Sequence, residues 1–384
     1  MAMVKRRFWL KQIETAWQER SIIWLSGVRR AGKTWLCQSL PDAEYFDCEL
    51  PSIRQKIEDP ETFLRSVQKK RIILDEIHRL PDPSELLKIA ADHFPAVKII
   101  ATGSSTLSAS ARFKDTLTGR KRELRLPPMI LEDLDDFGNT DMEHRFLFGG
   151  LPQFFLHDEI PERDYQEWMD AYWAKDIQEL FRLERKYSFC KFAELLFMQS
   201  GSLFEASRFA APCEVSRSSI TNYLSILEAT YVVQVVRPFS SRKSSEIVSA
   251  PKVYGFDTGF VCYYRGWRNV RPDDNGILWE HFVLNEMTAR LPGSRIQYWR
   301  DKNGSEIDFI LGNRKGTVTT IECKFSSRQF DPGNLLAFRR RYPGGKNFIV
   351  CNDIVDPFDR SFGDQTIRFT GLAGLIKELP SQSM

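Results

Sequence analysis

Residues 27–34, Gly-Val-Arg-Arg-Ala-Gly-Lys-Thr, match the pattern G-x-x-x-x-G-K-[ST] completely. The apolar run Ile22–Ser26 precedes the motif, and a helix is expected to follow over Lys33–Leu40. In such a loop the glycines let backbone N–H groups close around phosphate oxygens, and the helix N-terminus adds a favourable dipole. The strand, loop and helix together predict a nucleotide-phosphate site at the end of a strand in an α/β domain.

Residue types inside the motif indicate separate roles. Lys33 is expected to reach the β- and γ-phosphates, and the Thr34 hydroxyl to coordinate Mg²⁺. We therefore expect ATP as the ligand and Mg²⁺ as its cofactor. The candidate nucleotide-binding residues are Gly27, Arg30, Ala31, Gly32, Lys33, Thr34 and Trp35. A Gly-rich turn with a chance Lys-Thr is the alternative interpretation.

A second motif argues against that alternative. Arg71-Ile-Ile-Leu is an apolar strand pattern that ends in Asp75 and Glu76. An Asp at this strand end orients Mg²⁺, and the following Glu suits a general base that polarises the attacking water. A surface strand that ends in acids does not explain why the two motifs occur in this order and at this distance.

Two further segments carry candidate catalytic residues with open alternatives. The strand Val97–Thr102 runs into Gly103-Ser104-Ser105, where a hydroxyl could sense the γ-phosphate or the residues could simply form a Gly-Ser turn. The run from Arg112 to Arg125 is rich in basic residues. One arginine within it could act as an arginine finger on the ATP of a neighbouring subunit, while a solvated basic loop is the other outcome.

Length and composition predict a chain of several domains. With 384 residues, 42% of them hydrophobic and 27% charged, the chain can bury more than one sizeable core. Short β-rich runs alternate with helical stretches at first, followed by a mostly helical part and then by a second strand-rich part. We expect domains at residues 1–137, 138–249 and 250–384, with a linker or long hairpin tip at Ser240–Ser249.

The middle region, residues 138–249, is expected to be helical and to contain a winged-helix-like element. Helices over Leu203–Ala210 and Ser216–Ala229 flank a short turn, and Tyr231–Val236 offers a strand for a wing. On the second helix Arg217, Ser219 and Asn222 would face outward, where such folds contact a DNA major groove. The region is equally well interpreted as a helical packing module, so DNA remains a candidate partner.

The C-terminal region is expected to have the order helix–strand–strand–strand–helix–strand. A strand period of two separates Glu322 and Lys324 from Ile321 and Cys323, and Asp308 is a lone carboxylate in an apolar strand. Glu280 lies on the preceding helix. We expect Glu280, Asp308 and Glu322 to approach one point and hold a second Mg²⁺ or Mn²⁺, with Lys324 activating water or stabilising the phosphate charge.

These motifs together resemble a group of prokaryotic AAA+-like P-loop ATPases. In that group a domain of unknown function follows, and its last part looks like the PD-(D/E)XK restriction-endonuclease fold. The resemblance rests on the segments Gly27–Thr34, Asp75-Glu76, Gly103–Ser105, Leu117–Arg120, Phe148–Pro152 and Ala250–Asp257. It implies an ATPase in which Ser104 is a sensor and Arg120 a finger. Ile307, where that nuclease superfamily often has Pro, is a departure.

The predicted function is a Mg²⁺-dependent ATPase whose nucleotide state controls the C-terminal module. Two alternatives stay open: an ATP-gated DNA nuclease, and a non-catalytic DNA- or protein-binding regulator that uses ATP as a conformational switch. Such folds also persist as inert binding modules. A homo-oligomer is expected, because a finger acting in trans needs a neighbour.

Charge and hydropathy add a few expectations. Lys and Arg exceed Asp and Glu by 54 − 51 = +3, which neither favours nor excludes a polyanionic partner. No apolar run approaches the ~20 residues of a membrane helix, no signal peptide is evident, and seven cysteines lack a C-x-x-C pair. These features predict a cytoplasmic protein. Four aromatic residues are expected in the core, and two histidines in surface or satisfied core positions: Trp24, Trp35, Phe282, Phe348, His78 and His281.

Overall fold

The computed structural model of the chain describes residues 4–103, 117–178, 181, 183–240, 250–312 and 317–379. These residues pack into two compact units. Unit 1 comprises residues 1–142, 149–186 and 225–232, and unit 2 comprises residues 143–148, 187–224 and 233–384. Among the described residues, no helix is long and apolar enough to cross a membrane.

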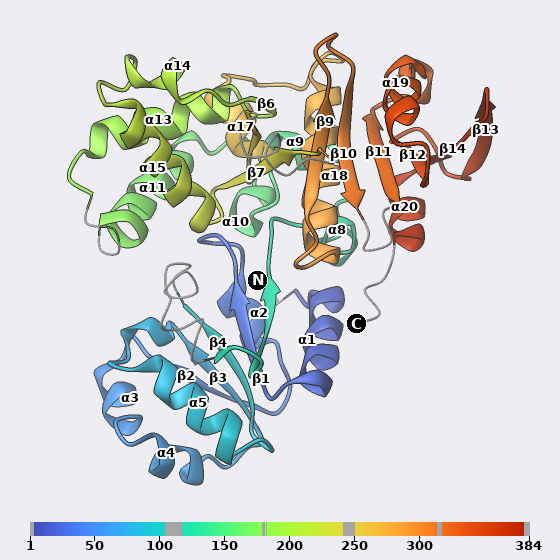
Figure 1. Cartoon of the computed structure of the whole chain (residues 1–384). Helices are drawn as coiled ribbons and strands as arrows, with labels where there is room; N and C mark the ends of the chain where they lie inside the picture. The colour runs from blue at the N-terminus through green and yellow to red at the C-terminus, as the bar shows by residue number, and fades with distance from the viewer. Residues whose placement is uncertain are drawn as a thin grey trace. The chain divides into compact units, whose positions relative to one another are not determined.

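Unit 1 is built on a parallel sheet with the strand order β2-β3-β4-β1-β5 (Figure 1). Its strands are β1 (Ile22–Ser26), β2 (Ala43–Asp47), β3 (Arg71–Asp75), β4 (Lys98–Thr102) and β5 (Lys121–Arg125). Its helical elements are α1 (Arg7–Glu19), α2 (Lys33–Gln38), α3 (Pro51–Lys56), α4 (Pro60–Ser66), η1 (Ile77–Arg79), α5 (Pro83–His93), α8 (Leu131–Phe137), α10 (Pro152–Phe155), α11 (Glu162–Tyr172) and a π-helical turn, η2 (Trp173–Gln178).

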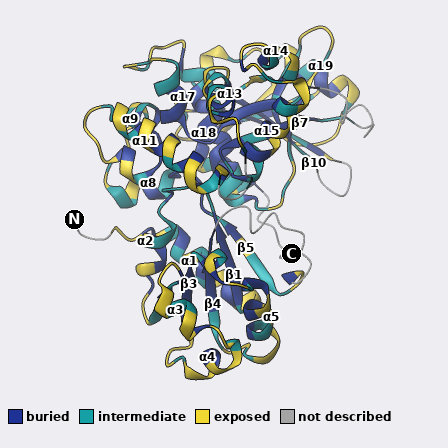
Figure 2. Ribbon diagram, turned by 90° about the vertical axis from the view of Figure 1, so that its left-hand side faces the viewer, coloured by how far each residue is buried: buried dark blue, intermediate teal, exposed yellow. Residues whose placement is uncertain are grey.

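Burial in the core of unit 1 explains why the central strands consist of apolar runs in the sequence. All five residues of β1 are buried, and β3 and β4 are each buried over their last four residues (Figure 2). Strands covered on both faces need apolar side chains on both faces. Alternate residues of β1 and β3 pack with α4 and α5 in one hydrophobic cluster, which includes Ile22, Trp24, Ile72, Leu74, Leu86 and Leu87.

The end of the basic run, for which a solvated loop was one interpretation, is a strand. Lys121–Arg125 pairs in parallel with β1, so this segment forms the edge strand β5. Only Leu124 within it is buried. An edge strand with one inward-facing side chain needs no apolar run, so the basic composition of this segment gave no strand pattern in the sequence.

Unit 2 is built on a mixed sheet that, in the described residues, has nine strands in the order β13-β14-β12-β11-β10-β9-β7-β8-β6 (Figure 1). The strands are β6 (Ser202–Leu203), β7 (Val233–Pro238), β8 (Lys252–Gly255), β9 (Ile296–Arg300), β10 (Glu306–Gly312), β11 (Val318–Lys324), β12 (Asn347–Cys351), β13 (Phe358–Phe362) and β14 (Gln365–Thr370). The sheet thus continues across residue 249, where the sequence predicts a domain boundary.

The helices of unit 2 include those predicted over residues 216–229, 279–291 and 335–341. They are α9 (Met142–Phe148), α13 (Lys186–Met198), α14 (Ala206–Ala210), α15 (Arg217–Ala229, whose last turns belong to unit 1), α17 (Thr258–Tyr264), α18 (Asn275–Arg290), η3 (Ser327–Gln329), α19 (Gly333–Arg341) and α20 (Leu372–Glu378). Strands β9–β12 with α18 and α19 match the expected helix–strand–strand–strand–helix–strand sequence. Strand β7 pairs with both β8 and β9, so it lies inside the sheet.

Candidate functional site

The loop of residues 27–32 joins β1 to α2 and has a backbone that its glycines permit. Gly27 faces the Leu126 carbonyl, to which an added Cβ would lie at 2.4 Å, so no larger residue fits. Arg30 and Gly32 have φ values of 64° and 91°, in the left-handed region. This geometry closes the loop over the start of α2.

Lys33 holds the loop from within. Its ammonium donates to the carbonyls of Gly27 and Val28 at 2.9 and 3.1 Å. Burial lowers its pKa, opposed by the nearby negative charges of Glu76, Asp176 and Asp75. Lys33 thus presents a desolvated cation to the cavity, where phosphate oxygens could take the place of the two carbonyls.

Asp75 lies at the end of β3 and is oriented by three hydroxyl groups. Thr34 Oγ1 and Tyr45 Oη donate to it at 2.8 and 2.5 Å, and Thr102 on β4 donates to its other oxygen. The Thr34 hydroxyl and the Asp75 carboxylate are hard oxygen donors placed side by side, which fits Mg²⁺. Tyr45 and Thr102 were not predicted, because long-range hydroxyl contacts leave no motif in the sequence.

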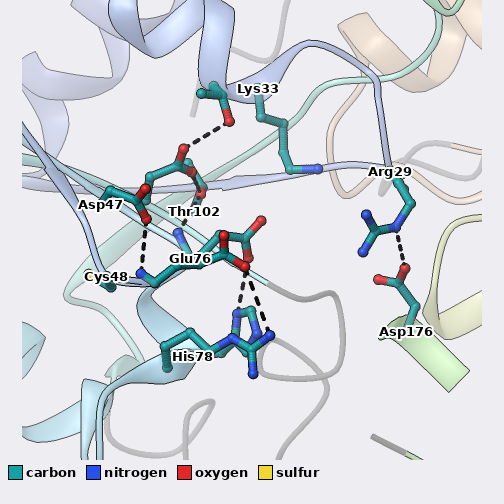
Figure 3. A network of polar contacts seen from close by, with 12 residues as sticks. Arg29, Lys33, Asp47, Cys48, Glu76, His78, Thr102 and Asp176 are labelled. Atoms are coloured by element: carbon teal, nitrogen blue, oxygen red, sulfur yellow. Dashed lines mark hydrogen bonds and ion pairs between the residues drawn. The ribbon is translucent and has the colours of Figure 1, made fainter. Parts of the chain in front are cut away.

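Glu76 follows in a left-handed conformation with φ of 52°. Its backbone N–H donates to Thr102 Oγ1 at 3.2 Å, and its carboxylate lies 3.1 Å from His78 Nδ1 (Figure 3). Burial alone would raise the pKa of Glu76, but the hydrogen bond and charge of His78, with Lys33 and Arg29, hold this pKa below its ordinary value. The carboxylate is therefore ionised. His78, which was expected at a surface or satisfied core position, contacts a candidate catalytic residue.

Lys33, Thr34, Glu76 and His78 line a cavity of about 560 Å³, within the usual size of small-molecule sites. Residues 152–178 of unit 1 close another side of it, and Val4, Phe137, Pro152 and Leu156 give it an apolar part. Trp35 also lines the cavity and is 60% exposed, so its expected place in the core is wrong. Trp24, Phe282 and Phe348 are buried as expected.

Arg30 and Ala31 differ in what they present. Arg30 lines the cavity, and its buried Nη1 has no hydrogen-bond partner among the residues that the structure describes. Ala31 is buried, and its carbonyl accepts from Arg6 Nη1 at 2.9 Å. Arg6 in turn donates to both oxygens of Asp133, at 2.8 and 2.6 Å. The Arg6–Asp133 pair thus holds the loop backbone in place. No motif in the sequence predicts this pair.

The two remaining catalytic candidates of the first domain are placed differently. Arg120 forms a surface ion pair with Asp92, at 2.7 and 3.0 Å, away from the cavity of its own chain. Ser104 lies outside the described residues.

In unit 2 the structure brings Glu280, Asp308, Glu322 and Lys324 together. Pairing of Phe309 with Ile321 sets Asp308 opposite Glu322, and Asp308 Oδ2 accepts from the Cys323 N–H at 2.8 Å. Lys324 Nζ lies 3.6 Å from Glu322. Asp308 also lies near enough to Glu280 on α18 for the charge of one carboxylate to act on the other. These four side chains therefore share one polar cluster in the core.

Lys252 on β8 is an additional member of this cluster that we did not predict. It is buried and forms ion pairs with Glu280, at 3.3 Å, and with Glu306. Tyr254 also donates to Glu280. The spacing of Lys252 and Tyr254 places both on one strand face, a signal that period-two alternation could have provided.

Glu322 is set apart within the cluster by its burial. Burial raises its pKa to about 8, opposed by Lys324 and reinforced by Asp308. Its Oε1 has no hydrogen-bond partner in the described part of the chain. No group of three His, Cys, Asp or Glu side chains among the described residues could hold a metal ion. Glu280 is paired with Lys252 instead, so the described residues do not show the second metal site that the sequence predicts.

His281 next to this cluster is a satisfied core residue, as expected. Its Nδ1 donates to the Ile277 carbonyl at 2.7 Å, so Nε2 accepts from Ser200 Oγ at 2.6 Å. Ser200 Oγ already accepts the Gly255 N–H. Burial lowers the pKa of His281 to about 4.

This shift predicts acid sensitivity. Because the pKa is lower in the folded chain than the ordinary ~6.5, the unfolded chain binds more protons between these values, and stability is lost as the pH falls from ~6.5 towards 4. Between pH 7 and pH 5, His281 should cost about 1–2 kcal/mol of unfolding free energy. Urea unfolding of wild type and His281→Gln checks this. Equal pH dependence in both would contradict it, and the half-exposed His157→Gln serves as control.

Comparisons with known proteins divide the chain into three segments. Residues 19–134 match the model of an AAA domain, residues 139–271 a domain of unknown function (DUF8612), and residues 275–365 another domain of unknown function (DUF4143). Two uncharacterized proteins, of Mycobacterium tuberculosis and Mycobacterium bovis, are 26% identical over 80% of this chain and 71% of their own length. The Walker-type ATPase of Pyrococcus abyssi superposes with a TM-score of 0.44 and 15% identity, over 68% of this chain and 96% of that chain.

Proposed function

Because residues 19–134 form an AAA-type P-loop ATPase domain, we propose that the chain binds Mg·ATP in the cavity of unit 1 and hydrolyses it. The contact between Thr34 and Asp75, at 2.8 Å, carries this proposal. It joins the two motifs of the sequence at one point, with the ionised Glu76 next in the chain.

Each side chain has a definite task in this reaction. The loop N–H groups and Lys33 hold the β- and γ-phosphates, and Thr34 and Asp75 hold Mg²⁺. Magnesium, when bound, neutralises charge that develops on the phosphate oxygens. Glu76 accepts a proton from the attacking water as the water oxygen bonds to the γ-phosphorus and the bond to the ADP oxygen breaks. The products are ADP and inorganic phosphate.

The test is phosphate release by the purified chain with Mg·ATP. We expect steady release that stops when EDTA removes Mg²⁺. Thr34→Val, which keeps the shape of the side chain but removes the hydroxyl, should bind Mg·ATP more weakly. A chain that neither binds nor hydrolyses nucleotide in the presence of Mg²⁺ would overturn the proposal.

We propose further that ATP sites are completed between subunits of a homo-oligomer, with Arg120 as the finger. Its guanidinium is held at the surface by Asp92, both about one-third exposed, so a neighbour's nucleotide could compete for it. Arg120→Ala should lower turnover at least ~10-fold with little change in nucleotide affinity. Arg122→Ala, which removes a neighbouring surface pair with Glu19, is the control. Turnover per chain that is unchanged on dilution to monomers would contradict this role.

For unit 2 we propose a DNA-binding module that nucleotide state controls and that does not cleave. Exposed Arg217 and Asn222 at the start of α15, together with the antiparallel strands β6, β8 and β7, support a winged-helix-like DNA contact. Lys252 supplies to Glu280 and Glu306 the positive charge that a metal would bring to a nuclease of the PD-(D/E)XK type. This observation favours the non-catalytic alternative.

Two assays separate the alternatives for unit 2. Gel-shift titrations with duplex DNA should give a dissociation constant that changes between ADP and a non-hydrolysable ATP analogue, and that Arg217→Ala weakens. Incubation with Mn²⁺ or Mg²⁺ should leave DNA intact with or without ATP. Cleavage that Asp308→Ala and Lys324→Ala abolish would establish the nuclease instead. DNA that is never retained would contradict DNA binding.

A further inference from the structure

An ion pair crosses the nucleotide cavity from the phosphate-binding loop to the helical segment of unit 1. Arg29 Nε lies 2.7 Å from Asp176 Oδ2, and both residues line the cavity (Figure 3). Arg29 is the third residue of the loop, and Asp176 lies in the π-helical turn η2 that follows α11. Trp168 on α11 also donates to the Arg29 carbonyl at 3.2 Å. Two contacts thus tie α11 and η2 to one residue of the loop.

The position of this pair along the bound nucleotide follows from Lys33. The Lys33 ammonium contacts the carbonyls of Gly27 and Val28, the residues just before Arg29. The lysine of such a loop reaches the β- and γ-phosphates. Arg29 and Asp176 therefore lie at the terminal-phosphate end of the cavity, and both act electrostatically on Lys33.

A carboxylate at this end competes with the nucleotide phosphates for Arg29. A triphosphate brings more negative charge to this end than a diphosphate, so it is repelled more strongly by Asp176 and attracted more strongly by Arg29. Arginine binds carboxylate and phosphate with the same planar fork, so one partner can replace the other without moving the backbone. Both side chains are partly buried, at 27% and 17% exposure, which limits screening by solvent.

We propose that Asp176 holds Arg29 in the nucleotide-free chain and that the terminal phosphate of a nucleoside triphosphate displaces Asp176 from it. Arg29 is then a phosphate-binding residue, and the pair distinguishes a triphosphate from a diphosphate. Release of Asp176 removes one of the two contacts that join the loop to α11 and η2, so the helical segment responds to the γ-phosphate. This inference rests on the proposed nucleotide binding.

Calorimetric titration of the nucleotide-free chain with Mg·ADP and with a non-hydrolysable Mg·ATP analogue tests the proposal. Asp176→Asn removes the competing charge and should tighten analogue binding about 10-fold, the order of one charge-assisted contact, with ADP affinity within about 2-fold. Arg29→Gln should weaken analogue binding about 10-fold, again with little effect on ADP. A gain in affinity for one nucleotide cannot come from misfolding.

Glu14→Gln is the matched control, since Glu14 pairs with Arg71 at 2.8 and 2.9 Å away from the cavity. It should change neither affinity. Equal changes for both nucleotides, or none, in the Asp176 and Arg29 variants would overturn the proposal and leave an ion pair that only tethers η2. Wild-type chain that binds neither nucleotide would overturn the proposed function as well, so the two failures are distinguishable.

Discussion

Glu76→Gln should bind Mg·ATP as tightly as wild type and release phosphate at least ~100-fold more slowly, since general-base catalysis contributes ~10²–10⁴. The carboxylate of Glu76 is ionised. Burial would raise its pKa, but the contact with His78 holds the pKa below its ordinary value. Glutamine keeps the size of the side chain and an oxygen that accepts from His78. It cannot accept a proton from water. The loss should therefore fall on turnover alone.

Nucleotide affinity and phosphate release, measured on the same preparation, check this expectation. Glu14→Gln again serves as control, because it makes the same chemical change at a carboxylate outside the cavity. Turnover near the wild-type rate in Glu76→Gln would assign the base to another group. A matching loss of affinity would instead indicate that Glu76 supports the shape of the site.

Lys33→Ala should lose nucleotide affinity by about 100-fold. Lys33 is the buried cation of the loop, and charge-assisted hydrogen bonds to phosphate are worth about 1.5–3 kcal/mol. The substitution also removes the donor to the carbonyls of Gly27 and Val28, so thermal unfolding should accompany the titration. Lys11→Ala, an exposed lysine on α1, is the control. Unchanged affinity in a folded Lys33→Ala chain would contradict the proposed site.

The elements of unit 1 could be predicted where burial on both faces dictates composition. β1 begins and ends as expected, and β3 and β4 differ by one residue. β5 could not be found, because an edge strand places one apolar side chain inward. The assignment of β7 to a wing was incomplete, since its pairing with β9 depends on residues far along the chain.

The site divides in the same way between local and long-range information. Gly27, Lys33, Thr34, Asp75 and Glu76 follow one another closely in two motifs, so their spacing carries the information. The Arg29–Asp176 and Arg6–Asp133 pairs join residues more than a hundred positions apart. A single sequence holds no record of such contacts. His78 was adjacent to a motif, but its orientation towards Glu76 depends on the turn that η1 makes.

A single-turnover experiment tests most directly the claim that this chain hydrolyses ATP. The chain is held in excess over γ-labelled ATP with Mg²⁺, so that every nucleotide is bound, and labelled phosphate is followed over time. Wild type should convert all the ATP in one exponential phase, whereas in Glu76→Gln the ATP should stay bound and intact. ATP that remains intact on the wild-type chain, or conversion at the same rate by both proteins, would contradict this expectation.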